Sequence, residues 1–264
     1  MAKNDFSSEV AENYEQKCLC VLVLDLSGSM NEIVDDSTAV ATGQTIYVDG
    51  KNYNIVTGGI SKLDNLVEGL QSFYTDIEND ETTSQRLELA VVTFGDSVNV
   101  IQSPSLISDI QLPELMADGD TALVDAVDEA IDIVNNRKKW YKSTGQPYYR
   151  PWIILITDGE PNEGQDVSAL AGKIKKDTSE KKYVFLPIGV DNANMQVLQS
   201  IQGQIPAMKL KGTKFGSFFK WLSASMGTVV SSEEGSAVDL SEGAASWMDS
   251  FTTVSYTHLR AHET

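Results

Sequence analysis

The chain has 264 residues, of which 41% are hydrophobic and 22% charged, so it can build a sizeable buried core, which argues against global disorder. Its 38 acidic residues outnumber its 20 basic residues and give a formal net charge of −18. A surface this acidic repels phosphate backbones, which argues against nucleic-acid binding. The length favours one α/β domain with additions, or a domain followed by a tail.

The sequence shows no sign of a membrane partner. No stretch approaches the ~20 apolar residues of a membrane span, and the polar, acidic residues 1–17 do not have the pattern of a secretory signal. Cys18 and Cys20 lie two residues apart in an apolar run. Side chains at that spacing in a strand share one face, and such neighbours rarely form a disulfide. The two residues are interpreted as packed, reduced thiols of a cytoplasmic protein.

The predicted elements alternate between apolar strands and amphipathic helices. Continuous apolar runs predict core strands, and apolar residues at helical spacing predict helices between them. The predicted strands, in chain order, cover residues 18–24, 87–94, 97–102, 152–157, 183–188 and 207–210. The predicted helices cover residues 63–77, 122–134, 167–174 and 215–226. This alternation predicts parallel βαβ units, and hence an α/β fold with a doubly wound, mostly parallel sheet flanked by helices.

A β-hairpin interrupts this alternation between the first strand and the first helix. Residues 46–55 alternate in polarity around Asp49-Gly50, a strong signal for a tight turn between two strands. The hairpin belongs to an insertion over residues 31–60, which is expected to cover or extend a binding face.

The ends of the chain differ in composition from its centre. Residues 1–15 are expected to form an N-terminal lead to a domain over residues 16–226, and residues 227–253 an acidic flexible tail. Residues 254–264 resemble the in-frame translation of a transposase sequencing adapter and contain both histidines of the chain. They are expected to play no part in function, which leaves no histidine for a metal or catalytic site.

Small oxygen-donor side chains cluster where predicted strands end. Asp25, Ser27 and Ser29 follow the first strand, Asp158 follows the strand at 152–157, and Thr121 precedes the long helix. Doubly wound sheets bind ligands beyond the carboxyl ends of their strands. Two carboxylates and three hydroxyls are therefore expected to converge there, a donor set that suits a hard cation such as Mg2+.

Each of these residues also has an ordinary structural explanation. Ser29 is a possible helix cap, and Thr121 is a possible N-cap of the following helix. Asp158-Gly159 alone is an ordinary turn. Taken together, in this order and on these elements, the five residues favour a metal site.

The five residues resemble the metal-ion-dependent adhesion site of the von Willebrand factor type A family, in which a Thr and an Asp complete an Asp-x-Ser-x-Ser motif. The resemblance covers about residues 16–226. It implies that three hydroxyl side chains touch the ion and that two carboxylates bind it directly or through water; these are Ser27, Ser29 and Thr121, with Asp25 and Asp158. Family members often have Gly where Asp120 stands, so Asp120 is expected to add negative charge near the ion.

Two further segments resemble the bacterial tellurium-resistance TerY group within that family. They are residues 151–161, which contain Asp158, and residues 215–226. The resemblance implies a bacterial stress or tellurium-resistance-type signalling system, with an operon-encoded kinase or phosphatase as a possible partner.

The expected function is metal-dependent docking rather than catalysis. An ion held mostly by neutral hydroxyls keeps much of its positive charge, and it then favours a carboxylate of another molecule in its open position. A protein partner is therefore expected to supply an Asp or Glu to Mg2+, with Mn2+ as the other candidate ion.

Two other function classes remain open from the sequence. One is a metal-binding accessory subunit of an ATPase-driven, chelatase-like complex. The other is a Mg-dependent phosphatase, which would want a second acid where Ser27 stands. Residues 57–62 contain Gly and Lys without the spacing of a phosphate-binding loop, so nucleotide binding is not favoured.

Overall fold

The computed structural model describes residues 15–48, 51–109, 114–233, 237–239, 241–249 and 259–260. Its central sheet has six strands in the order β10-β9-β8-β1-β6-β7. In chain order these are β1 (Cys18–Asp25), β6 (Leu87–Phe94), β7 (Val98–Leu106), β8 (Trp152–Thr157), β9 (Val184–Gly189) and β10 (Met208–Lys209). Only the β6–β7 pair is antiparallel within this sheet, which confirms the predicted fold class.

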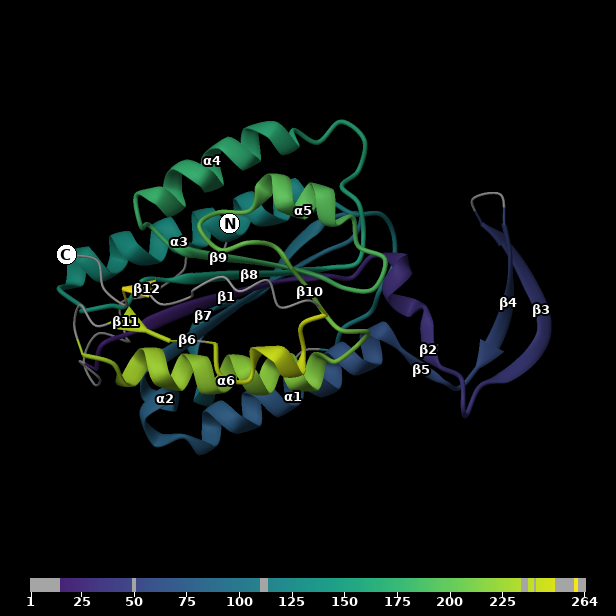
Figure 1. Cartoon of the computed structure of the whole chain (residues 1–264), viewed down its shortest axis with the longest axis horizontal. Helices are drawn as coiled ribbons and strands as arrows, with labels where there is room; N and C mark the ends of the chain where they lie inside the picture. The colour runs from purple at the N-terminus through teal and green to yellow at the C-terminus, as the bar shows by residue number, and fades with distance from the viewer. Residues whose placement is uncertain are drawn as a thin grey trace.

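Helices cover both faces of the sheet (Figure 1). They are α1 (Lys62–Asn79), α2 (Glu81–Arg86), α3 (Leu123–Thr144), α4 (Val167–Ser179), α5 (Met195–Ile201) and α6 (Phe215–Ser231). Alternate side chains of β1 enter two separate cores, one with α1 and α6 and one with α3, α4 and α5. The apolar run of β1 is continuous because both of its faces are buried. No helix of the described residues is long and apolar enough to cross a membrane.

The two cysteines lie on the same face of β1, as their spacing predicts. Cys18 and Cys20 are fully buried and form no disulfide. Burial raises the pKa of the Cys18 thiol to about 12, so the thiolate form is suppressed at neutral pH. Both residues act as small apolar side chains of the core.

The order of the strands reverses beside β1. Strand β1 pairs with β6 on one side and with β8 on the other. The chain connects β1 to β6 through α1 and α2. Connections leave these neighbouring strands toward opposite faces, so their carboxyl ends diverge and leave room for a ligand. The predicted oxygen donors after β1 and β8 lie at this point.

The insertion forms an arm, defined here as residues 33–61, that projects from the carboxyl end of the sheet (Figure 1). Its base is the antiparallel pair β2 (Ile33–Asp35) and β5 (Ile60–Ser61). Its outer part is the hairpin β3 (Val40–Val48) and β4 (Lys51–Thr57), longer than the predicted 46–55. The predicted turn residues Asp49 and Gly50 lie outside the described residues.

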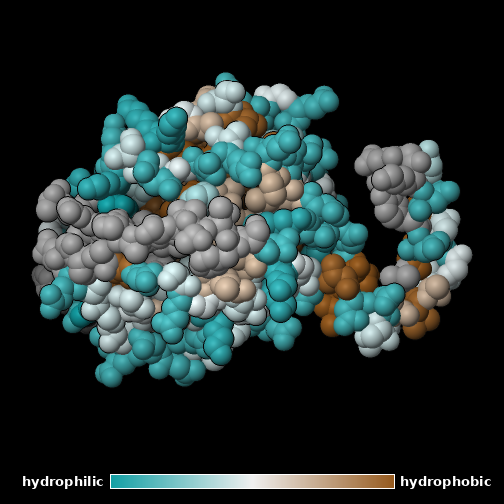
Figure 2. Space-filling view, viewed as in Figure 1, coloured by the Kyte–Doolittle hydropathy of each residue, from teal (hydrophilic) through white to brown (hydrophobic). Residues whose placement is uncertain are grey.

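Apolar side chains are exposed along the arm. Figure 2 shows apolar surface where the arm meets the body and on the arm itself. The exposed large apolar residues of the arm are Val34, Val40, Ile46, Tyr47 and Ile60. The arm therefore presents apolar side chains to solvent beside the carboxyl end of the sheet.

Described parts of the chain after residue 226, the segment predicted to be an acidic tail, pack on the domain. Helix α6 continues to Ser231 because Val229 and Val230 extend its buried face. Further on, Trp247 is fully buried, with ring centroids 4.9 Å from Phe218 and 5.0 Å from Trp221. The apolar residues, rather than the acidic ones around them, decide the placement of this segment. Of residues 254–264, the structure describes only the Leu259–Arg260 backbone, paired with Ala237–Val238.

The apolar pattern of the sequence does not predict two short helices, α2 and α5. The six residues of α2 carry no apolar stripe, and the helix begins at an Asp80 side chain that accepts a hydrogen bond from the Thr83 amide. Helix α5 begins in the same way at Asn194. Capping defines such short helices, whereas apolar periodicity reveals only long ones.

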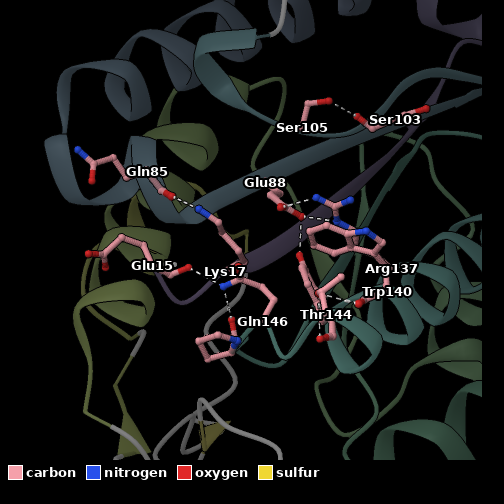
Figure 3. A network of polar contacts seen from close by, with 12 residues as sticks. Glu15, Lys17, Gln85, Glu88, Ser103, Ser105, Arg137, Trp140, Thr144 and Gln146 are labelled. Atoms are coloured by element: carbon pink, nitrogen blue, oxygen red, sulfur yellow. Dashed lines mark hydrogen bonds and ion pairs between the residues drawn. The ribbon is translucent and has the colours of Figure 1, made fainter. Parts of the chain in front are cut away.

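A buried ion pair joins α3 to the amino end of the sheet (Figure 3). The Glu88 carboxylate of β6 accepts hydrogen bonds of 2.8 Å and 2.6 Å from the Arg137 guanidinium, and a third from the Tyr141 hydroxyl. The guanidinium carbon also lies 4.1 Å from the centroid of the Trp140 ring. Because Glu88 and Arg137 are both buried, each depends on the other for its charge to be tolerated.

We expect Glu88→Gln to lower the free energy of unfolding by about 3–5 kcal/mol, because it removes the carboxylate charge that pairs with the buried Arg137 guanidinium. Urea titration followed by circular dichroism measures the change. Asp128→Asn is the matched control. The Asp128 and Lys173 side chains are 44% and 40% exposed, and such a surface pair contributes only about 0–1 kcal/mol. Equal losses in the two variants would contradict the role assigned to Glu88.

Candidate metal centre

Asp25 ends β1 with its carboxylate fully buried at the edge of the sheet. One oxygen, Oδ1, accepts a 2.8 Å hydrogen bond from the Ser27 amide. The other, Oδ2, accepts from the Thr157 hydroxyl at the end of β8. Thr157 directly precedes Asp158, but no motif in the sequence marks it as a residue of the site. Thr157 fixes the orientation of Asp25 from the neighbouring strand.

The two serines of the loop after β1 connect Asp25 to Asp158. The Ser27 and Ser29 hydroxyl oxygens lie 3.1 Å apart. The Ser29 hydroxyl donates a 2.6 Å hydrogen bond to Oδ1 of Asp158. Ser27 and Asp158 are buried, whereas Ser29 is exposed. The structure thus brings four of the five predicted residues into one chain of contacts that reaches the surface at Ser29.

Thr121, the fifth predicted residue, lies near the Asp25 carboxylate, on the other side of Gly159. A methyl group placed on Gly159 would lie 2.9 Å from the Thr121 hydroxyl oxygen and 3.3 Å from Oδ2 of Asp25. The absence of a side chain at Gly159 therefore lets the Thr121 hydroxyl approach Asp25.

Backbone contacts fix the loop that carries Thr121. The Thr121 amide donates a 2.7 Å hydrogen bond to the Asn162 side chain, and the Asn162 amide donates back to the Thr121 carbonyl at 3.0 Å. The Gly28 amide donates to the Gly119 carbonyl at 3.0 Å, which ties this loop to the loop after β1. Sequence reasoning missed Asn162, and no motif marks it as a positioning residue.

The helix-capping explanations do not account for the hydroxyls. The N-cap of α3 is Ala122 rather than Thr121, and it makes no side-chain capping bond. The 3-10 turn η2 (Gly28–Asn31) has Ser27 as its N-cap, again without a side-chain capping bond. The hydroxyls of Thr121, Ser27 and Ser29 therefore make no capping bonds that start a helix. The Ser29 hydroxyl instead contacts Ser27 and Asp158.

Negative charge dominates the electrostatics of the site. Burial raises the pKa of Asp25, and the neighbouring Asp158 raises it further, although hydrogen bonds from Ser27 and Thr157 act in the opposite direction. The site is therefore an environment in which a cation would relieve the cost of burying two carboxylates. The exposed Asp118 and Asp120 lie on the neighbouring loop and add negative charge.

One ammonium group also reaches the site, and the sequence did not reveal it. The Lys62 Nζ, at the start of α1, lies 2.9 Å from Oδ2 of Asp158. It also contacts Glu32 at 2.7 Å and Asp191 at 3.0 Å. Burial alone would lower the pKa of Lys62, but its hydrogen bonds to these three carboxylates outweigh burial and raise the pKa. Lys62 is thus charged at neutral pH.

The donor set fits a hard divalent cation. It contains two carboxylates and three hydroxyls, all oxygen atoms, as Mg2+ prefers, and Ser29 gives access from solvent. The described residues contain no group of three or more His, Cys, Asp or Glu side chains placed to hold a metal. A soft transition-metal site is therefore not favoured among them, and a cation here would depend on hydroxyl oxygens.

Known proteins show the same architecture. The von Willebrand factor type A domain profile matches residues 20–218. None of the curated proteins compared with the chain matches it. Among solved structures, the PilB minor pilin from Streptococcus sanguinis is 16% identical, with 83% of this chain and 64% of that chain covered and a TM-score of 0.53.

Two further structures are similar at lower TM-scores. Proximal thread matrix protein 1 from the mussel byssus is 18% identical, with coverage of 83% and 46% and a TM-score of 0.46. The ArnB paralog VWA2 from Sulfolobus acidocaldarius is 14% identical, with coverage of 85% and 47% and the same TM-score. The chain spans less than two-thirds of the length of these three proteins. At 16% identity, the likeness to the pilin concerns the fold alone. On the profile match over most of its length, the chain belongs to the von Willebrand factor type A domain family.

Proposed function

We propose that this domain is a metal-dependent protein-docking module whose ion is Mg2+, or Mn2+ in its place. The observation that carries the proposal is the arrangement at the ends of β1 and β8. Hydroxyls from Ser27, Ser29 and Thr121 gather around two buried carboxylates, and Ser29 opens the cluster to solvent.

The proposed ligands fall into two groups, carboxylates and hydroxyls. Asp25 and Asp158 supply negative charge from the buried side, and their orientations are fixed by Thr157 and Ser29. Ser27, Ser29 and Thr121 supply neutral oxygens. A bound ion would supply positive charge at the protein surface, where an Asp or Glu of a partner completes its coordination.

The side chains favour docking over catalysis. No histidine occurs among the described residues, and the Lys62 ammonium is occupied by three carboxylates. The site thus offers carboxylates that would hold an ion, but no histidine or unpaired ammonium group among the described residues for general acid–base chemistry. We propose a non-enzymatic role.

The proposed setting is a cytoplasmic bacterial stress or tellurium-resistance-type signalling system. Its support is the resemblance of residues 151–161 and 215–226 to the TerY group. An operon-encoded kinase or phosphatase is the proposed source of the partner carboxylate. The many acids near the site, including Asp118 and Asp120, disfavour a partner with a broadly acidic surface.

We expect the double variant Ser27→Ala/Ser29→Ala to lose Mg2+ affinity by more than about 100-fold. Changes to residues that only support metal ligands cost about 10–100-fold, and this variant removes two ligands themselves. Isothermal titration calorimetry measures the affinity. The fold should survive because little apolar area is removed. Ser84→Ala/Ser200→Ala, which changes a half-buried serine on α2 and an exposed serine on α5, is the control and should bind as wild type does. Equal binding by both double variants would refute the site.

The open coordination position has its own test. Acetate added to the Mn2+-loaded protein should displace water from the ion and lower the water-proton relaxation enhancement, because a carboxylate prefers the open position to water. Acetamide, the neutral amide counterpart of acetate, is the control and should leave the relaxation enhancement unchanged. If Mn2+ binds but acetate has no effect, carboxylate docking at the ion is wrong although the metal site stands.

Gly159→Ala should weaken Mg2+ binding at least about tenfold without unfolding the domain. The new methyl would lie 2.9 Å from the Thr121 hydroxyl oxygen, so this oxygen must move away from Asp25. Gly172→Ala makes the same chemical change on α4, where no atom lies within 4 Å, and should leave Mg2+ affinity unchanged. Calorimetry on both variants checks the expectation, and unchanged affinity in Gly159→Ala would remove Thr121 from the ligand set.

A further inference from the structure

Lys62 is the buried cation of the site. Its side chain is only 2% exposed, yet its ammonium contacts carboxylates from three separate segments. Glu32 precedes the arm, Asp158 follows β8, and Asp191 follows β9. A long, charged side chain is rarely enclosed to this extent unless its charge is matched. The three carboxylates provide that match.

The local fold fixes the position of Lys62. Ser61 caps α1 in a reciprocal arrangement with Asp64, which makes Lys62 the first residue of the helix. The Lys62 amide donates to the Glu32 carbonyl at 3.0 Å, and the neighbouring Ile33 pairs with Ser61 across the base of the arm. Backbone hydrogen bonds therefore fix the start of the Lys62 side chain next to the site, and the carboxylates hold its ammonium group there.

Asp158 is shared between Lys62 and the hydroxyl cluster. Its Oδ1 accepts from Ser29, and its Oδ2 accepts from Lys62. The Asp158 side chain is only 1% exposed, so without an ion it depends on these two partners to remain buried. Lys62 thus supplies a positive charge on the far side of the same carboxylate that an ion would bind.

We propose that Lys62 is an internal counter-cation, a proposal that rests on the proposed metal site. As a positioning residue, Lys62 keeps the site assembled without the ion, and it lowers the affinity of the site for the ion. The two effects have one cause. The ammonium stabilises the carboxylates of the metal-free site, and the same positive charge repels an incoming divalent cation. Metal affinity is therefore set below what the ligand oxygens alone would give.

The test compares Lys62→Met, nearly isosteric and uncharged, with Lys62→Arg, which keeps the charge. The metal-free Lys62→Met protein should have a lower thermal midpoint than wild type, and it should bind Mg2+ and Mn2+ about tenfold more tightly, within the usual range of such couplings. Lys62→Arg should bind close to wild type. Thermal unfolding in a chelator and isothermal titration calorimetry with Mg2+ and Mn2+ measure both effects.

Two further variants keep the test decisive. Lys62→Gln is also uncharged but can still donate a hydrogen bond to Asp158, so it serves if the Met variant fails to fold, and it too should bind the ions more tightly. Lys182→Met removes a lysine paired with Asp177 and Glu180 ahead of β9, at the opposite end of the sheet, and should leave affinity unchanged.

The outcomes separate this inference from the proposed function. Unchanged or weaker metal binding by the uncharged variants, with binding by wild type, overturns the counter-cation role and leaves the metal site intact. Absence of binding in wild type and in every Lys62 variant overturns the metal site, and the inference with it. Binding by Lys62→Met or Lys62→Gln that exceeds wild type supports both.

Discussion

The parallel pairing of β1 with β8 is the constraint on which the rest of the site depends. Its register places Leu24 opposite Ile156, so the next residues, Asp25 and Thr157, meet at the edge of the sheet. A slip of one residue would turn Asp25 to the other face of β1 and separate it from Asp158. Both strands are buried on both faces, so their apolar side chains fix the register, and the core thereby fixes the geometry of the polar site.

The two ends of the sheet treat buried charge differently. At the amino end, the Glu88 carboxylate receives three hydrogen bonds, two of them from one guanidinium, and needs nothing from outside. At the carboxyl end, Asp25 receives only neutral donors, and Asp158 shares one ammonium with two other carboxylates. The first arrangement holds the fold together, whereas the second leaves negative charge that a cation can neutralise.

Sequence patterns revealed what depends on periodicity and on strand ends. The core strands and the four long helices follow from apolar spacing, and the predicted convergence of Asp25, Ser27, Ser29 and Asp158 follows from their places after parallel strands. Ligation of a metal by these residues stays a prediction.

Patterns could not reveal contacts made by single side chains across long sequence separations. Lys62 stands 96 residues from Asp158, and its neighbours mark only the start of a helix. Asn162 holds Thr121 across 41 residues without any motif. The acidic composition after residue 226 says little about Trp247, which is buried because its apolar ring packs against Phe218 and Trp221.

The base of the arm explains how a long insertion can enter the chain beside the candidate metal site without displacing its side chains. The β2–β5 pair holds Glu32 and Lys62 together at the point where the insertion leaves and rejoins the domain. Beyond this base, β3 and β4 form a separate two-stranded sheet. Lengthening a closed loop costs little free energy, because the cost grows only with the logarithm of its length. The arm can therefore change in length or sequence beyond the base while the Lys62 contacts stay fixed, so surface can be added beside the candidate site without altering the arrangement of its side chains.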